Sequence, residues 1–252
     1  MPTALFISPH LDDVSFSCGG LAACLADAGW RTVLATVFTA TVLPVSGFAL
    51  ACQLDKGLAA DVDYMALRRA EDREAASLLG FTEIRWLDLP EAPHRGYHSD
   101  AALFGPIGAH DAVMPALTAS VLRLNDEIQP DLVLVPQALG NHVDHQVVVL
   151  AAGHINIQAS RAYYRDTPYA IRDPDAAPAR AVPNMPLVTV PIEVAMARKV
   201  AAACAYASQI GFQFKTADAL DHSLRAFAAQ EGGGILAERF ISSSPHLRSF
   251  AA

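Results

Sequence analysis

The sequence predicts a single-domain α/β fold of Rossmann-like type, with a mostly parallel sheet flanked by helices. A chain of 252 residues is long enough to bury one sizeable core. Short apolar, β-branched runs alternate with helical stretches, which is the pattern of parallel strands joined by helical crossovers. We see no internal repeat and no linker, so we expect residues 1–252 to form one domain.

The N-terminal part of the chain is expected to form a βαβ unit. Residues 4–8 are a short apolar run, and residues 14–29 read as a helix after a tight loop. The β-branched run 32–38 predicts the second strand. Residues 39–61 have no clear period and contain proline and glycine, so we expect a long loop, and loops of that length are usually functional or mobile.

The middle of the chain continues the alternation. Residues 64–79 predict a helix that ends at Gly80, a helix C-cap signal. Residues 84–87 predict a third strand, and residues 90–110 predict an irregular stretch. The remaining expected elements are a helix capped by Asp111 and ending at 128, a buried strand at 131–135, a helix at 146–157, a loop with five prolines at 166–186, a strand at 187–191 and a helix at 194–207.

Composition limits the classes of partner and compartment. A net charge of −8 argues against nucleic acid and anionic membranes, which both reward clustered Lys and Arg. No apolar run approaches the roughly 18–20 residues of a membrane-spanning helix, so we expect no membrane insertion. The N-terminus opens directly into a predicted strand and has no basic n-region, so we expect a cytoplasmic protein. The sequence leaves open whether the chain forms a homo-oligomer.

The four cysteines form no CxxC pair, so we expect buried free thiols and neither disulfides nor a zinc cluster. Any metal site must then be built from histidines and carboxylates. Two motifs supply them, each after a predicted strand: His10 with Asp12 and Asp13, and His142 with His145. Because the carboxyl ends of parallel strands share one edge of a sheet, these two motifs can meet in space.

Two imidazoles and one carboxylate leave a coordination position for water, which is typical of catalytic zinc. Bound zinc lowers the pKa of water to about 7. Asp12 and Asp13 are adjacent, so one of them can bind the metal while the other accepts a proton from water.

Other functions use the same residue types. Two histidines and one carboxylate also form the iron(II) site of non-haem oxygenases, although the spare carboxylate favours hydrolysis. A nucleotide- or sugar-binding module without catalysis would also suit this sheet edge, but neither a GxGxxG nor a Walker motif supports it. We expect no metal-binding role for the six other histidines: His94, His98, His110, His154, His222 and His246.

Both motifs resemble those of a known family. Residues 8–13 read Ser-Pro-His-Leu-Asp-Asp, with Gly-Gly at 19–20, and resemble the Pro-His-Pro-Asp-Asp signature of the PIG-L/LmbE family of zinc-dependent N-acetylglucosaminyl deacetylases. Residues 142–145 read His-Val-Asp-His and resemble its second motif, His-Pro-Asp-His. Leu11 and Val143 stand where the family commonly has proline, which affects loop stiffness and not chemistry.

Two further stretches agree with the resemblance, which covers roughly residues 3–215. Residues 68–71 resemble the family's Arg-x-x-Glu helix, and residues 199–209 resemble its C-terminal Lys-to-Ser-Gln helix. The match is poor in 39–61, where a Thr-x-Gly-acidic stretch would be usual, and this leaves the identity of the substrate open.

The resemblance implies a small-molecule substrate, an N-acyl amino sugar or its conjugate, from which an acyl group, expected to be acetyl, is removed. Arg68 would contact the sugar; the alternative is a helix-surface arginine paired with Glu71 or Asp72. Glu91 lies where the family has an acidic sugar-hydroxyl contact. By position, the resemblance implies His10, Asp13 and His145 as ligands of Zn²⁺ or of another divalent ion such as Fe²⁺. It implies Asp12 as the general base. It also implies that His142, oriented by Asp144, stabilises the oxyanion and helps the amine leave.

Overall fold

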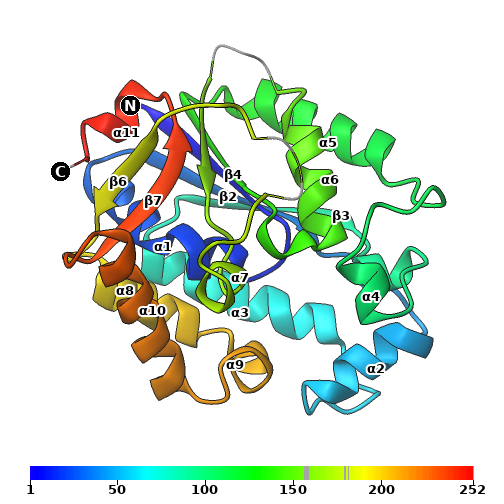
Figure 1. Ribbon diagram of the computed structural model, residues 1–252. Coiled ribbons are helices and arrows are strands. Elements are labelled where there is room, and N and C mark those ends of the chain that lie inside the picture. The colour runs from blue at the N-terminus through cyan, green and yellow to red at the C-terminus, as the bar shows by residue number, and fades with distance from the viewer. Residues whose placement is uncertain (156–158, 179, 181, 252) are drawn as a thin grey trace.

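The computed structural model describes residues 1–155, 159–178, 180 and 182–251 (Figure 1). In that part of the chain, seven strands form one sheet in the order β3-β2-β1-β4-β5-β7-β6. Neighbouring strands from β3 to β5 run parallel, and β7 runs antiparallel to both β5 and β6. The mostly parallel sheet is therefore confirmed. The strands are β1 (Thr3–Ser8), β2 (Arg31–Phe38), β3 (Glu83–Leu89), β4 (Leu132–Pro136), β5 (Ser160–Tyr164), β6 (Leu187–Pro191) and β7 (Ala237–Ser242).

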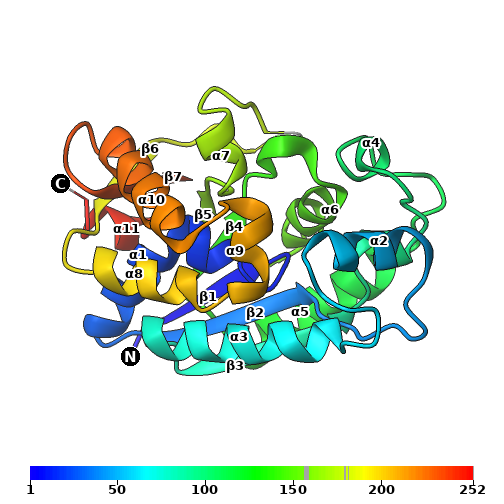
Figure 2. The same cartoon turned by 90° about the horizontal axis from the view of Figure 1, so that it is seen from below.

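Helices cover both faces of the sheet. Figures 1 and 2 show α5 and α6 on one face, and α1, α3 and α8 packed together on the other. The helices in the described residues are α1 (Asp13–Asp27), α2 (Gly47–Asp55), α3 (Tyr64–Leu79), α4 (Asp100–Leu103), α5 (Met114–Ile128), α6 (Val143–Ala152), α7 (Tyr169–Arg172), α8 (Met196–Cys204), α9 (Ala207–Gln213), α10 (Ala217–Glu231) and α11 (Pro245–Arg248), with 3₁₀ turns η1 (Ala92–His94) and η2 (Leu139–Asn141).

The central strand β1 is apolar on both of its faces because both are covered. Leu5 and Ile7 pack in one core cluster with residues of α5 and α6, whereas Phe6 packs in another cluster with Leu21 of α1. Successive side chains of a strand point to opposite faces, so a doubly covered strand reads as a continuous apolar run. This is why residues 4–8 carry a strong strand signal.

Several elements lie where the sequence predicts them, and others do not. Helix α3 has the predicted bounds and ends at Gly80 in the left-handed conformation. The segment 39–61, expected to be a loop, contains α2. Asp111 does not cap α5, which begins at Met114; its side chain accepts the N–H of Val113 and binds Arg95 instead.

The helix predicted at 146–157 lies at residues 143–152, and positions 156–157 are outside the described residues. The sequence analysis did not predict β5, β7 or α10. In the described residues, no helix is both long enough and apolar enough to cross a membrane. The four cysteines are free thiols, but only Cys18 is fully buried, so the expectation of buried thiols is correct for that residue alone.

The strand order reverses between β1 and β4, which is where parallel α/β sheets bind their ligands. From β1 the chain adds β2 and β3 on one side, and then crosses to β4 and β5 on the other. Such a reversal opens a crevice at the carboxyl ends of the two central strands. The segments that leave β1 and β4 are the two that carry the histidine motifs.

Candidate metal centre

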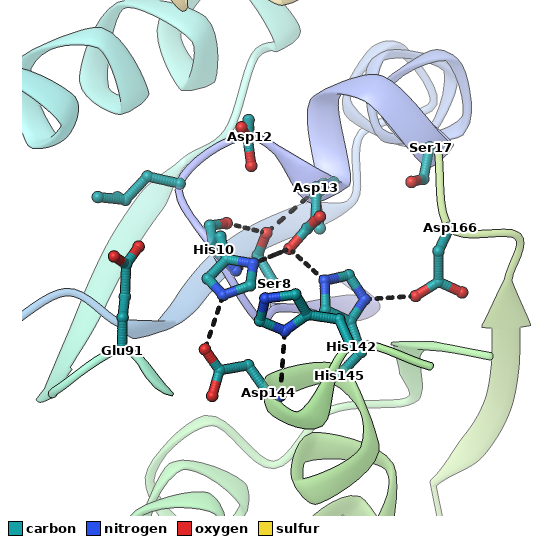
Figure 3. Close-up of polar contacts among 12 residues, drawn as sticks. Ser8, His10, Asp12, Asp13, Ser17, Glu91, His142, Asp144, His145 and Asp166 are labelled. Carbon is teal, nitrogen blue, oxygen red and sulfur yellow. Dashed lines mark hydrogen bonds and ion pairs between the residues drawn. The ribbon is translucent and has the colours of Figure 1, made fainter. Parts of the chain in front are cut away.

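Three side chains from these two segments converge beyond the ends of β1 and β4 (Figure 3). His10 lies in the turn between β1 and α1, Asp13 is the first residue of α1, and His145 lies in the first turn of α6. Asp13 Oδ2 accepts the backbone N–H of His10 at 2.7 Å, which fixes the turn. One ligand atom from each of the three residues lies within 4.8 Å of the others.

The two imidazoles both face the same carboxylate oxygen. His10 Nδ1 is 3.3 Å from Asp13 Oδ2, and His145 Nε2 is 3.4 Å from the same atom. The other nitrogen of each ring is held by a second carboxylate: His10 Nε2 lies 2.9 Å from Asp144 Oδ2, and His145 Nδ1 lies 2.6 Å from Asp166 Oδ1. Both of these second carboxylates are fully buried.

This arrangement fits a cation. A neutral ring that donates one N–H to a carboxylate presents the lone pair of its other nitrogen, and here that nitrogen of both rings faces Asp13. Among the described residues, His145 Nε2 is buried without any hydrogen-bond partner. Burial lowers the pKa of both rings, but the carboxylates of Asp13, Asp144 and Asp166 raise it above the ordinary value, so this pair of nitrogens attracts a positive charge, which a proton or a metal ion can supply. A divalent metal would supply that charge to His10, Asp13 and His145, which are the three predicted ligands.

Asp144 plays a different part from the one expected. Its carboxylate binds the ring of His10 and accepts the N–H of Ala92 at 3.1 Å and Nη1 of Arg95 at 2.7 Å. It therefore orients His10 and not His142. His10, His142 and Asp144 also form a possible ligand group by distance, but the donors around Asp144 already occupy both of its oxygens.

Asp144 binds the ring of His142 through its backbone and not through its carboxylate. The N–H of Asp144 donates to His142 Nδ1 at 3.2 Å, so that His142 caps α6. Burial and the nearby His10 lower the pKa of His142 to about 3. The ring is therefore neutral, with its proton on Nε2.

The sequence analysis missed Arg95, whose side chain is 7% exposed. Besides Asp144 it binds Asp111, with Nε at 3.1 Å and Nη2 at 2.9 Å from the two carboxylate oxygens. Its guanidinium lies 4.7 Å from the ring centre of Phe38, at the end of β2. No local signal marks Arg95, because its partners come from the loop before α5 and from α6. Asp166, which follows β5, was missed for the same reason.

The spare carboxylate of the first motif is held apart from the ligand group. Asp12 is buried, and its Oδ2 lies 2.9 Å from Nη2 of Arg68. Burial raises the pKa of Asp12 to about 6, although Arg68 opposes the shift. Burial would also raise the pKa of Asp13, but His145 and His10 beside it lower it to about 2. The pKa of Asp12 is thus raised and that of the adjacent Asp13 is lowered, so Asp12 binds a proton more readily.

Arg68 is not a surface residue of its helix. It is buried, and Glu71 and Asp72 do not pair with it: Glu71 accepts the N–H and hydroxyl of Ser208, while Asp72 binds other side chains. The Glu71–Ser208 contact joins the two stretches, 68–71 and 199–209, that resemble the family. Nη1 of Arg68 lies 3.4 Å from Oε1 of Glu91, so both predicted sugar contacts lie together.

A cavity of about 290 Å³ opens beside the three ligands. The segments 39–61 and 90–110, expected to be irregular, both contribute to it: 39–61 through α2 and the residue after it, and 90–110 through η1 and α4. Helices α7 and α9 close the other side with residues that the sequence analysis did not select. Their contributions include Tyr169, Arg172, Gln209 and Phe212. None of the six other histidines belongs to either ligand group in the described residues.

The chain is similar to known proteins in sequence and in fold. The PIG-L family, described as GlcNAc-PI de-N-acetylase, matches residues 5–156. A 2'-N-acetylparomamine deacetylase from Streptomyces fradiae is 36% identical over 173 residues, which are 66% of this chain; the matched part spans 57% of the length of that relative.

Solved structures share the fold over nearly the whole chain. The A40926 pseudoaglycone deacetylase is 26% identical, with a TM-score of 0.80, and 95% of this chain and 96% of that chain are covered. A zinc-inhibited form of teicoplanin deacetylase, at 24% identity and a TM-score of 0.80 over 96% of this chain and 99% of that one, shows the same fold. Since the family match covers more than half of the residues, this chain belongs to the PIG-L family.

Proposed function

We propose that this protein is a metal-dependent N-deacetylase that hydrolyses the amide of an N-acetylated amino sugar or its conjugate, with residues 1–252 as one catalytic domain. The observation that carries the proposal is the pair of imidazole nitrogens facing one carboxylate oxygen, with each ring fixed by its own buried carboxylate. The deacetylase relatives support the same reaction class. We propose Zn²⁺ as the metal, held by His10, Asp13 and His145.

A divalent ion bound there would act as a Lewis acid on the amide carbonyl and lower the pKa of a nearby water molecule. Asp12 is the base that we assign to this water. Its Oδ2 is held by Arg68, so we place the transferred proton on Oδ1. A carboxylate whose pKa is about 6 can accept a proton near neutral pH and then release it again, which is what general acid–base catalysis requires.

We assign Asp12 as the only residue that carries a proton between the water molecule and the departing nitrogen. The water oxygen bonds to the acyl carbon while its proton moves to Asp12; the C–N bond then breaks, and that proton passes to the departing nitrogen. We assign neutral His142 one of its two expected tasks: its Nε2–H donates a hydrogen bond to the oxyanion, but it does not protonate the departing amine. A ring whose pKa is lowered to about 3 holds no spare proton for the amine.

We place the substrate sugar next to Arg68 and Glu91. Both line the cavity beside the ligands, as do Tyr64 and Gln209, which offer a hydroxyl and an amide group to a polar ligand. Because Arg68 also holds Asp12, binding of the sugar and placement of the base are linked through one guanidinium. We therefore propose Arg68 and Glu91 as the sugar contacts.

The test is amine release under metal control. Purified protein is analysed for bound metal, stripped with a chelator, and assayed with N-acetylglucosamine conjugates after addition of Zn²⁺, Fe²⁺ or Co²⁺. We expect one equivalent of metal to restore release of amine and acetate in equal amounts. Zinc is titrated beyond one equivalent as well, because a relative is known in a zinc-inhibited form.

Two results would contradict the proposal. Full activity of the stripped protein would exclude a metal-dependent reaction. Consumption of dioxygen with Fe²⁺, without release of amine, would favour an oxygenase that uses the same residues.

A further inference from the structure

The outer part of the cavity carries two exposed aromatic side chains. Phe104 follows α4 and is 40% exposed, and Phe212 lies on α9 and is 55% exposed; both line the cavity. They come from segments more than a hundred residues apart in the sequence. Exposed large apolar groups gathered at one cavity mark a surface that a ligand covers.

The two rings border different parts of the cavity lining. The Phe104 ring is 5.3 Å from the ring of His142 and 6.0 Å from that of Tyr169, so it borders the reacting centre. Lys56 Nζ, which follows α2, lies 5.1 Å from the ring centre of Phe212 and 5.4 Å from that of Tyr64, so Phe212 borders the proposed sugar contacts. Figures 1 and 2 show α2 and α4 on the side of the molecule away from both termini, with α7 and α9 nearer its middle. A group attached to the bound sugar would leave the site between these two rings.

The charges of the outer lining differ from those near the ligands. The inner carboxylates have cationic or imidazole partners: Arg68 beside Asp12, and Arg95 beside Asp144. Further out, Lys56 and Arg172 line the cavity, and among the described residues neither forms an ion pair with a carboxylate. Lys56 donates to the carbonyl of Cys52, and Arg172 to Gln213.

Two carboxylates of the described lining lie near these cations: Asp100 at the start of α4, and Glu91, which acts on Lys56 and is also bound by Arg68. Glu91 therefore offsets part of the charge of Lys56, whereas Arg172 keeps its full charge. A neutral or anionic group is favoured beside Arg172 over a cationic one.

We infer that the preferred substrate is an N-acetylated amino sugar that carries an aromatic substituent of neutral or negative charge, seated between Phe104 and Phe212. This inference rests on the proposed deacetylase function and names its substrate class. Stacking of an aromatic substituent against two rings should raise kcat/KM about 5- to 10-fold over a methyl substituent. An exposed charge pair changes it less, by about 2- to 5-fold.

The experiment compares four glycosides of N-acetylglucosamine with the same anomeric configuration: methyl, 4-nitrophenyl, 4-carboxyphenyl and 4-(trimethylammonio)phenyl. Amine release is measured with metal-loaded protein. We expect the nitrophenyl glycoside to exceed the methyl glycoside, and the carboxylate to exceed the trimethylammonium. Phe212→Ala and Phe104→Ala should each reduce the aryl-to-methyl ratio, because the ratio cancels any general loss of active protein.

Matched variants separate specific from general effects. Lys56→Met keeps the length of the side chain and should reduce the preference for the carboxylate, whereas Lys215→Met, at an exposed site outside the cavity, should not. Leu54→Ala removes an exposed apolar side chain of α2 that does not line the cavity, and should leave the aryl-to-methyl ratio unchanged.

The possible results differ for the two proposals. Equal kcat/KM for all four glycosides would overturn the inference about the substituent and leave the deacetylase function standing. A preference for the trimethylammonium glycoside would overturn the charge argument. No amine release from any glycoside, with metal bound, would overturn the proposed function itself, and this inference with it.

Discussion

Replacement of Asp166 by Asn should weaken metal binding without unfolding the protein. Asp166 Oδ1 faces Nδ1 of His145 at 2.6 Å, and Oδ2 accepts the backbone N–H groups of Gln137 at 3.0 Å and Leu139 at 3.2 Å. An asparagine has one carbonyl oxygen and one NH₂ group to place on these two sides. Both oxygens of Asp166 face N–H donors, so in either orientation the NH₂ group of the asparagine faces another donor.

The structure indicates which orientation is preferred. If the NH₂ group faced Gln137 and Leu139, the buried N–H of Leu139 would lose its acceptor at a cost of about 1–3 kcal/mol, and the N–H of Gln137 would keep only the carbonyl of Tyr164. The oxygen therefore stays with the backbone, and the NH₂ group faces His145. Nδ1 of that ring must then accept a hydrogen bond, which moves its proton to Nε2, the atom that faces Asp13. A protonated Nε2 cannot bind a metal.

We expect the Asp166→Asn protein to bind Zn²⁺ about 10- to 100-fold more weakly, the usual effect of losing a carboxylate that orients a metal-binding histidine. This corresponds to about 1.4–2.8 kcal/mol. The assay is competition with a chelating dye, together with the Tm of the metal-free protein, which should change little. Asp126→Asn, an exposed position on α5, is the control. Unchanged zinc affinity in Asp166→Asn would refute the argument, and unfolding of the metal-free variant would show that Asp166 is mainly structural.

Four further predictions concern the site and its support. His145→Ala should lose bound metal, because two remaining protein ligands rarely hold a catalytic ion; metal analysis showing near-stoichiometric zinc would contradict the ligand assignment. Asp12→Asn should keep the metal and lower kcat by about 10²–10⁴-fold; loss of metal instead would mean that the two aspartates have exchanged roles. His142→Asn, which can still accept the cap hydrogen bond of α6, should keep metal and Tm while kcat falls by about 10²–10³-fold, and wild-type turnover would make it a spectator. Lys199→Met removes the cation whose Nζ lies 2.7 Å from Oε1 of buried Glu238, and it should lower the free energy of unfolding by roughly 3–5 kcal/mol. Urea titration measures this change, and a loss below about 1 kcal/mol would show that the pair contributes little.

The sequence alone was sufficient to predict the parallel core of the sheet and the place of the site. The runs 4–8, 32–38 and 131–135 are mainly apolar because their strands are covered on both faces, and this signal is local. Once these strands are taken as parallel, their carboxyl ends share one edge. The convergence of His10 and Asp13 with His145 could then be predicted, and the structure places the three together.

The antiparallel edge of the sheet could not be read from the sequence. β5 begins with Ser160 and Arg161, and β7 includes Glu238 and Arg239, so neither is a continuous apolar run. β7 tolerates the buried charge of Glu238 because Lys199 and two backbone N–H groups of α1 bind it. These partners are 39 or more residues away along the chain, and no local pattern reveals them.

The carboxylates that orient the two histidines were likewise decided only by the tertiary structure. Asp144 is next to a ligand in the sequence, yet it orients His10, 134 residues away, because Arg95 and the N–H of Ala92 hold its carboxylate on that side. Asp166 reaches His145 because β5 pairs with β4 and ends beside α6. A sequence motif identifies residue types that can bind a metal; which nitrogen of each ring faces the metal depends on buried partners that only the folded chain brings together.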